Sequence, residues 1–180
     1  MTLEDVKKKV YSLIEEYSED SDTLTEDEDL AAKMNFVINQ IQTELTRFKK
    51  IPASTTMNVT DGQTIQAKSI DKNFYQLGLI RGVEYETIND NIIFHDDGTA
   101  RIYYYKFPNR ITDETEDSYV FELTDDLMEI LPYGVAGDLL KSDVSSQYGQ
   151  IYSNRYREML NTLDPRYGTG QFEIAGGIGV

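Results

Sequence analysis

The hydrophobic periodicity of the chain changes twice, and this change constrains the fold more than any other feature of the sequence. Apolar residues recur every three or four positions in residues 1–52, occur in short alternating runs in residues 53–123, and return to helical spacing from residue 124. Spacings of three and four predict amphipathic helices, whereas alternation predicts strands. The order indicated is therefore two helices, a β region and two further helices.

The N-terminal region predicts two helices, with Thr2 as N-cap of the first and Thr25 as N-cap of the second. We expect the second helix to be the longer one and to end at Ile51 and Pro52. The apolar face of the first helix comprises Leu3, Val6, Val10, Leu13, Ile14 and Tyr17, and that of the second comprises Leu30, Met34, Val37, Ile41, Leu45 and Phe48.

The β region contains several turn signals between strand-like runs. Asp61 and Gly62 separate TTMNV from QTIQAKSI. The strongest predicted hairpin joins NIIFH to TARIYYYKF through Asp96, Asp97 and Gly98, because an Asp-Gly pair tolerates the positive φ that tight hairpins need.

Three successive tyrosines, residues 103–105, lie in the second strand of this expected hairpin. Successive side chains of a strand point to opposite faces, so at least one tyrosine should lie outward or at an interface. The run YVFEL is expected to close the β region at Leu123.

The C-terminal region predicts two more helices. Thr124 caps the first, and the second stops before Pro165. Their apolar positions are Leu127, Ile130, Leu131, Val135 and Leu139 in the first helix, and Tyr148, Tyr152, Tyr156, Met159, Leu160 and Leu163 in the second.

The expected fold class is α+β. A helical hairpin cannot bury its apolar stripe alone, so we expect the two N-terminal and two C-terminal helices to form one antiparallel helical bundle. This bundle would comprise residues 1–52 and 124–164, with an antiparallel β module, residues 53–123, inserted between its halves. Residues 165–180 are rich in glycine and are expected to form a flexible, extended C-terminal arm.

The charge of the chain argues against tight binding of nucleic acid. It has 32 Asp and Glu against 17 Lys and Arg, a formal net charge of −15, and such a surface repels phosphate unless a basic patch intervenes. The nearest candidates are short and lie among acids: Lys7–Lys9, Lys49 with Lys50, and Arg155 with Arg157.

The composition indicates a folded protein that stays in the cytoplasm. The chain has no cysteine, so it has neither a disulfide framework nor thiolate chemistry. No apolar run is long enough to span a membrane, and the N-terminus lacks the apolar core of a secretory signal.

The sequence offers no catalytic set, and we expect a protein that is not an enzyme and that needs no metal or cofactor. The one histidine, His95, lies at a predicted turn, where histidine is usually a solvated surface residue. The acidic run from Asp20 to Asp29 departs from the calcium-loop pattern at its glycine and final glutamate positions. The glycines Gly168 and Gly170 are not followed by a helix, so they indicate no phosphate cradle.

The segment LPYGVAGDLLKSD has helical apolar spacing but includes Pro132, Gly134 and Gly137, which are costly in a helix interior. One interpretation is that these small residues make room for a bulky ridge on the next helix. A close helix contact between subunits is the alternative. The ridge would consist of Tyr148, Tyr152 and Tyr156.

The same region resembles a known family. The order ILPYGVAGDLLKSDVSSQYGQIYSNRYREMLNTLD is similar to the C-terminal helix pair of head-to-tail connector (adaptor, or head-completion) proteins of tailed bacteriophages. The matching residues are Leu131, Pro132, Tyr133, Val135, Ala136, Leu139, Leu140, Ser142, Asp143, Tyr152, Arg155 and Tyr156. The glycines Gly134 and Gly137 stand where bulkier residues or alanine are usual in the family.

The resemblance implies a structural virion protein in the neck, between capsid and tail, assembled in the host cytoplasm. Such adaptors form a ring, commonly a dodecamer, that binds the portal protein above and a tail or neck (stopper) protein below. Packaged DNA passes through the ring without specific binding, and no membrane is involved.

The resemblance also suggests which residues make contacts. The C-terminal arm of such adaptors usually grips the portal, for which Phe172, Ile174, Ile178 and Val180 are the candidates here. The candidates for contacts between subunits or helices are Pro132, Tyr133, Gly134, Gly137, Tyr148, Tyr152, Arg155 and Tyr156.

Two alternatives remain open. Another neck component, such as a stopper or tail-completion protein, would suit the β module equally well. An acidic DNA-mimicking regulator, which belongs to a different functional class, would account for the charge alone.

Overall fold

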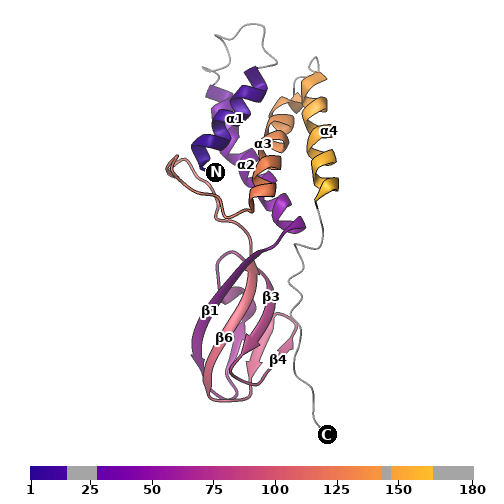
Figure 1. Cartoon of the computed structure of the whole chain (residues 1–180). Helices are drawn as coiled ribbons and strands as arrows, with labels where there is room; N and C mark the ends of the chain where they lie inside the picture. The colour runs from indigo at the N-terminus through magenta and orange to yellow at the C-terminus, as the bar shows by residue number, and fades with distance from the viewer. Residues whose placement is uncertain (16–27, 143–146, 164–180) are drawn as a thin grey trace. The chain divides into compact units, whose positions relative to one another are not determined.

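The computed structural model describes residues 1–15, 28–142 and 147–163 of the chain (Figure 1). The α-helices of these residues are α1 (Leu3–Glu15), α2 (Glu28–Phe48), α3 (Asp125–Leu139) and α4 (Gln147–Thr162). The strands are β1 (Ile51–Val59), β2 (Thr64–Gln66), β3 (Phe74–Arg81), β4 (Tyr85–Ile88), β5 (Asn91–Phe94) and β6 (Gly98–Lys106). The predicted order of helices and strands along the chain is thus present.

The described residues divide into two units. The helical unit comprises residues 1–49 and 108–163, and the β unit comprises residues 50–107. This division differs from the expected one at both ends of the β unit. Residues 50–52 belong with the strands, and residues 108–123 belong with the helices.

The predicted architecture, an antiparallel four-helix bundle with an inserted β module, is wrong. The described residues form a mixed α+β arrangement of four helices and two three-stranded antiparallel sheets. The helices are not equivalent members of a bundle, because α1, α2 and α4 each pack against α3. Ten of the 15 residues of α3 are buried, as expected for a central helix that is apolar on most sides.

The first helix begins as the sequence predicts. The Thr2 hydroxyl accepts a hydrogen bond from the Asp5 amide (3.2 Å), and the Asp5 carboxylate accepts one from the Thr2 amide (2.8 Å). This reciprocal pair is a capping box, and the Thr2 amide that donates to Asp5 lowers the pKa of that carboxyl. The predicted apolar face is fully buried at Leu3, Val6, Val10 and Ile14.

The second helix ends earlier than predicted. It stops at Phe48, which is 50% exposed rather than part of the buried face. Ile51 and Pro52 belong instead to β1, where they pair with Lys106 and Tyr105 of β6. Proline is tolerated there because β1 is an edge strand and its outer side needs no amide donor.

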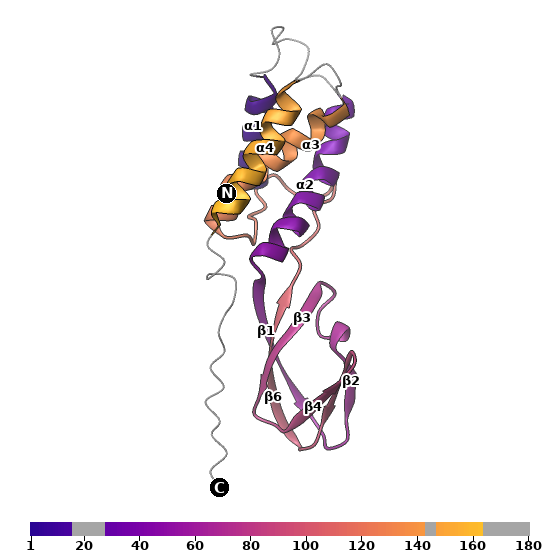
Figure 2. The same cartoon turned by 90° about the vertical axis from the view of Figure 1, so that its right-hand side faces the viewer.

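The β unit consists of two sheets with the strand orders β1-β6-β3 and β2-β5-β4. Figure 2 shows them packed face to face. Their shared core includes Ile80, Ile102 and Tyr104 from the first sheet and Ile92 and Phe94 from the second. Every pairing is antiparallel.

The predicted hairpin between NIIFH and TARIYYYKF is wrong, because β5 and β6 belong to different sheets. The Asp96 carboxylate accepts a hydrogen bond from the Glu84 amide (3.0 Å), and that of Asp97 accepts one from the Asp61 amide (2.8 Å). The aspartates therefore bind neighbouring loops while the chain crosses between the sheets. The tight hairpin is instead β4–β5, where Asn89 adopts a φ of 55°.

The segment between β6 and α3 is held by polar side chains of α2. The Asn39 amide group donates to the Ile111 carbonyl (2.7 Å) and accepts from the Ile111 amide (2.8 Å), and Gln42 donates to the Asn109 carbonyl (3.1 Å). The expected strand YVFEL is absent from this segment, where the pairing of Val120 is a single bridge to Thr2.

The tyrosines of β6 alternate as predicted. Tyr104 lies in the core, where its hydroxyl donates to the Asp71 carboxylate (2.9 Å), whereas Tyr103 and Tyr105 are half-buried on the opposite face. Burial, and then Asp71, raise the pKa of Tyr104. The Asn73 amide, followed by the Tyr104 hydroxyl, keeps the pKa of Asp71 low.

Candidate functional site

The contact between α3 and α4 depends on two glycines. A Cβ atom at Gly134 would lie 2.8 Å from the Tyr156 ring and 2.9 Å from Ile41 Cγ2. At Gly137 it would lie 2.8 Å from the Ser153 Oγ and 2.9 Å from the Ser153 backbone nitrogen. Real Cβ atoms do not approach other atoms so closely, so these two glycines allow α4 to pack against α3 within one chain.

The remaining candidates on α3 have different surroundings. Pro132 is buried inside the helix, where its ring removes the amide that would bond to the Met128 carbonyl. Tyr133 is half-buried, and its ring centroid lies 6.4 Å from that of Tyr152. Both residues thus take part in packing within the helical unit.

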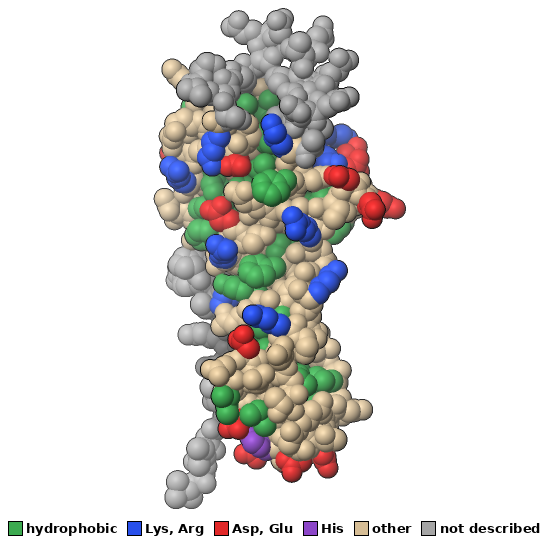
Figure 3. Space-filling view, turned by 180° about the vertical axis from the view of Figure 1, so that it is seen from behind, with side chains coloured by type: hydrophobic (Ala, Val, Ile, Leu, Met, Phe, Trp, Pro, Cys, Tyr) green, Lys and Arg blue, Asp and Glu red, His purple; other side chains and the backbone are tan. Residues whose placement is uncertain are grey.

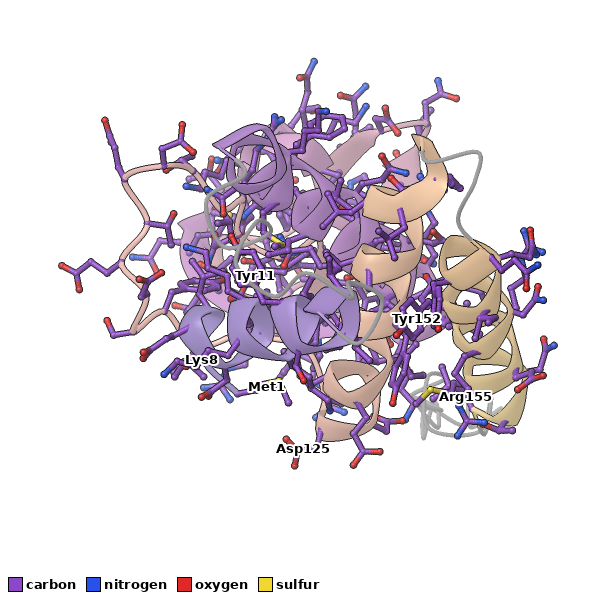
Figure 4. All side chains as sticks on the ribbon, turned by 90° about the horizontal axis from the view of Figure 1, so that it is seen from above. Met1, Lys8, Tyr11, Asp125, Tyr152 and Arg155 are labelled. Atoms are coloured by element: carbon purple, nitrogen blue, oxygen red, sulfur yellow. The ribbon has the colours of Figure 1, made fainter. Side chains whose placement is uncertain are left out.

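Tyr152 of α4 points toward the other helices of this unit (Figure 4). Its hydroxyl donates a hydrogen bond of 2.7 Å to the Leu13 carbonyl of α1, and its ring lies 6.4 Å from that of Tyr148. A buried tyrosine hydroxyl usually finds such a partner. Tyr152 therefore ties α4 to α1.

Tyr156, one turn further along α4, differs from Tyr152. Its hydroxyl is buried and forms no hydrogen bond of ordinary distance and angle. Burial, and then the nearby Glu44 carboxylate, raise the pKa of Tyr156 far above its usual value. The Tyr156 ring fills the space that Gly134 leaves, because a Cβ atom there would lie 2.8 Å from it.

The outer side of α4 carries side chains that the helical unit does not bury. Tyr148 is 38% exposed and Ile151 is 52% exposed. Arg155 follows on the same side and forms an ion pair of 3.5 Å with Glu158. These four residues, spaced by three and four, form a stripe that we call the α4 surface.

A second exposed surface lies on α2. Phe36 is 62% exposed and Phe48 50%, and the exposed Lys33 and Arg47 lie on the same helix. We call these four residues the α2 surface. Figure 3 shows hydrophobic and basic side chains interspersed on this side of the helical unit. Sequence reasoning missed it, although the position of Phe36 between the buried Met34 and Val37 could have revealed it.

The four candidate residues of the arm, Phe172, Ile174, Ile178 and Val180, lie outside the described residues. So do two of the predicted helix residues, Tyr17 and Thr25, together with most of the acidic run. The interpretation of the arm therefore rests on the sequence.

The described residues include the single histidine of the chain and many of its Asp and Glu side chains. Within them, no group of three His, Asp or Glu side chains is placed to hold a metal ion. His95 is partly exposed, with its Nε2 3.6 Å from a Glu86 carboxylate oxygen. No helix of the described part is both long and apolar enough to cross a bilayer.

The described residues line two pockets. One in the β unit, of about 410 Å³, is lined by Phe74, Leu77, Tyr85 and other residues, of which Asp90 is the only carboxylate. One in the helical unit, of about 170 Å³, is smaller than typical ligand sites. Its lining includes the Glu44 and Asp138 carboxylates, Lys141 and the Tyr156 ring.

Comparison with known protein families and with curated proteins identifies no relative of this chain. No protein-family model matches the sequence, and no curated protein matches it either.

Proposed function

We propose that this chain is a structural virion protein, an adaptor that forms a ring under the portal of a tailed bacteriophage. The ring joins the capsid to the tail and continues the DNA channel. The proposed partners are the portal protein, a tail or neck protein, and further copies of the chain. The resemblance of the α3–α4 region to head-to-tail connectors motivates the proposal.

The observation that carries the proposal is the presence of two different exposed surfaces on one helical unit. A closed ring requires heterologous contacts, in which one surface of each subunit meets a different surface of the next. The α4 surface offers Tyr148 and Ile151, and the α2 surface offers Phe36 and Phe48. Aromatic and arginine side chains are the types enriched in protein interfaces.

The C-terminal arm gives the proposal a direct test. Deleting residues 168–180 should leave the cooperative unfolding of the chain unchanged but abolish its co-sedimentation with portal particles. The reason is that the candidate portal contacts, Phe172, Ile174, Ile178 and Val180, all lie in the deleted segment. A truncated chain that still sediments with portals would contradict the assignment of the arm.

A further inference from the structure

The charges of the β unit are unevenly distributed. Residues 50–107 contain six Lys and Arg against seven Asp and Glu, so this unit is nearly neutral in a chain of net charge −15. The strands of the β1-β6-β3 sheet contain no Asp or Glu at all. The acids of the unit lie in turns, loops and β4: Asp61, Asp71, Glu84, Glu86, Asp90, Asp96 and Asp97.

The register of this sheet places two arginines side by side on its outer face. Ile102 and Tyr104 of β6 point into the core, so Arg101 points outward, and its direct cross-strand partner on β3 is Arg81. Both arginines are exposed, and in the described part of the chain no carboxylate forms an ion pair with either. Like charges directly opposite each other destabilise a sheet, so the pair is costly without an anion.

Two tyrosines on the same face of the sheet contact the side chains of Arg81 and Lys50. The Arg81 guanidinium lies 5.9 Å from the Tyr103 ring centroid, and the Lys50 Nζ lies 5.1 Å from that of Tyr105. The Lys50 Nζ also donates to the Gln76 side-chain carbonyl (2.7 Å). These cation–π contacts restrict the cations to an extended position along the face before any ligand binds.

We propose that this outer face, defined by Lys50, Arg81, Arg101, Tyr103 and Tyr105, binds the sugar–phosphate backbone of duplex DNA without regard to sequence. This inference goes beyond the proposed function and does not rest on it, because an adaptor ring needs no DNA-binding surface.

The neighbours of the cations favour DNA over a protein partner. The exposed outward positions of β1 include three small polar residues, Ser54, Thr56 and Asn58, whereas a protein interface needs an apolar centre. Interfaces with DNA are more polar and more positively charged. The tyrosine rings already contact cations, which leaves the phosphates as the recognised groups rather than stacked bases.

The salt dependence of binding tests the proposal on the full-length chain. A fluorescently labelled 20-base-pair duplex should bind with an affinity that falls as salt rises from about 0.05 to 0.2 M, with a logarithmic slope near −3 for three cations. The double variant Arg81→Gln/Arg101→Gln should bind about tenfold more weakly at the lowest salt, with a slope smaller by about two.

The matched control removes the same charge elsewhere. Lys8→Gln/Lys141→Gln changes two exposed, ion-paired cations of the helical unit and should bind like the wild type. Thermal unfolding of every variant checks that the fold is retained.

Four results would overturn the proposal: no binding by the wild type, an equal loss in both double variants, tighter binding of a single-stranded oligothymidine of the same length, or tighter binding of polyglutamate. The third would indicate base stacking and the fourth an acidic protein partner. Because no portal is present, these results are independent of whether the chain forms an adaptor ring.

Discussion

At the scale of single residues, two tyrosines of α4 show how similar sequence positions acquire different roles. The Tyr152 hydroxyl bonds to the Leu13 carbonyl, whereas the Tyr156 hydroxyl is buried near the Glu44 carboxylate and forms no hydrogen bond of ordinary distance and angle. A helical period of four predicts that both side chains face inward, but it carries no information about hydroxyl partners. The partner of each hydroxyl depends on which groups of α1 and α2 lie opposite it.

This difference leads to a paired prediction. Tyr152→Phe should lower the free energy of unfolding by about 1 kcal/mol, because it removes the hydrogen bond to the Leu13 carbonyl. Tyr156→Phe should lower it by less, because the removed hydroxyl forms no hydrogen bond of ordinary distance and angle. Urea unfolding at neutral pH measures both. A larger loss in Tyr156→Phe than in Tyr152→Phe would contradict the assignment.

The raised pKa of Tyr156 predicts a pH dependence. In the unfolded chain a tyrosine ionises near pH 10, whereas burial keeps Tyr156 protonated to a higher pH in the folded state. Its contribution to stability is therefore complete below about pH 10 and is lost as the pH rises further. Unfolding free energies measured from about pH 8 to 11 should decline less steeply in Tyr156→Phe than in the wild type. Parallel declines would show that Tyr156 titrates normally.

The glycines of α3 give a third prediction. Alanine at Gly134 or Gly137 gains about 1 kcal/mol of helix propensity but must displace α4, at a cost of about 1–3 kcal/mol. Gly137→Ala should be the more destabilising, because the added atom would meet the backbone of Ser153, which cannot rotate away.

The matched control for the glycines is Glu129→Ala, an exposed position of the same helix that should change stability by less than about 0.5 kcal/mol. Thermal unfolding compares the three variants. If both glycine variants were as stable as this control, the close contact between α3 and α4 would be refuted.

At the scale of elements, the sequence predicts helices better than strand pairing. The faces of α1 and α3 follow from local spacing: four of the predicted residues of α1 and all five of α3 are buried. The pairing of β5 and β6 was predicted wrongly because the Asp-Gly turn signal is local, whereas the assignment of a strand to one of two sheets depends on contacts far apart in sequence. Likewise, nothing local shows that Asn39 and Gln42 bind the backbone of residues 109–111.

The surfaces of α2 and α4 give a prediction about assembly. Phe36→Asp and Ile151→Asp should each leave the fold intact, because both side chains are exposed. Each should prevent ring formation on the portal, since burial of such a side chain contributes about 1.5–3 kcal/mol per contact. Mixing the two variants should give pairs of subunits and no rings, because only one kind of contact remains.

The control for assembly is Gln150→Asp, which adds the same side chain at an exposed position of α4 that is not three or four residues from any member of the stripe. It should form rings like the wild type in chemical cross-linking with portal particles. Rings formed by either Phe36→Asp or Ile151→Asp would exclude that surface from the subunit contact.

At the scale of the whole molecule, the net charge of −15 does not show how the charged side chains are distributed over the surface. It correctly indicates that no stretch of the sequence is strongly basic, but it hides a sheet without any Asp or Glu. Arg81 and Arg101 are 20 residues apart and become neighbours through strand register. Surfaces built in this way cannot be read from runs of charge along the chain.

The central claim is that the chain acts by binding other proteins as a structural ring. Electron microscopy of the purified chain mixed with its portal tests this claim most directly. We predict a closed ring of chain copies coaxial with the portal, in which the α2 surface of each copy meets the α4 surface of the next. Portal particles that carry no added ring, although the chain is folded and in excess, would contradict the account.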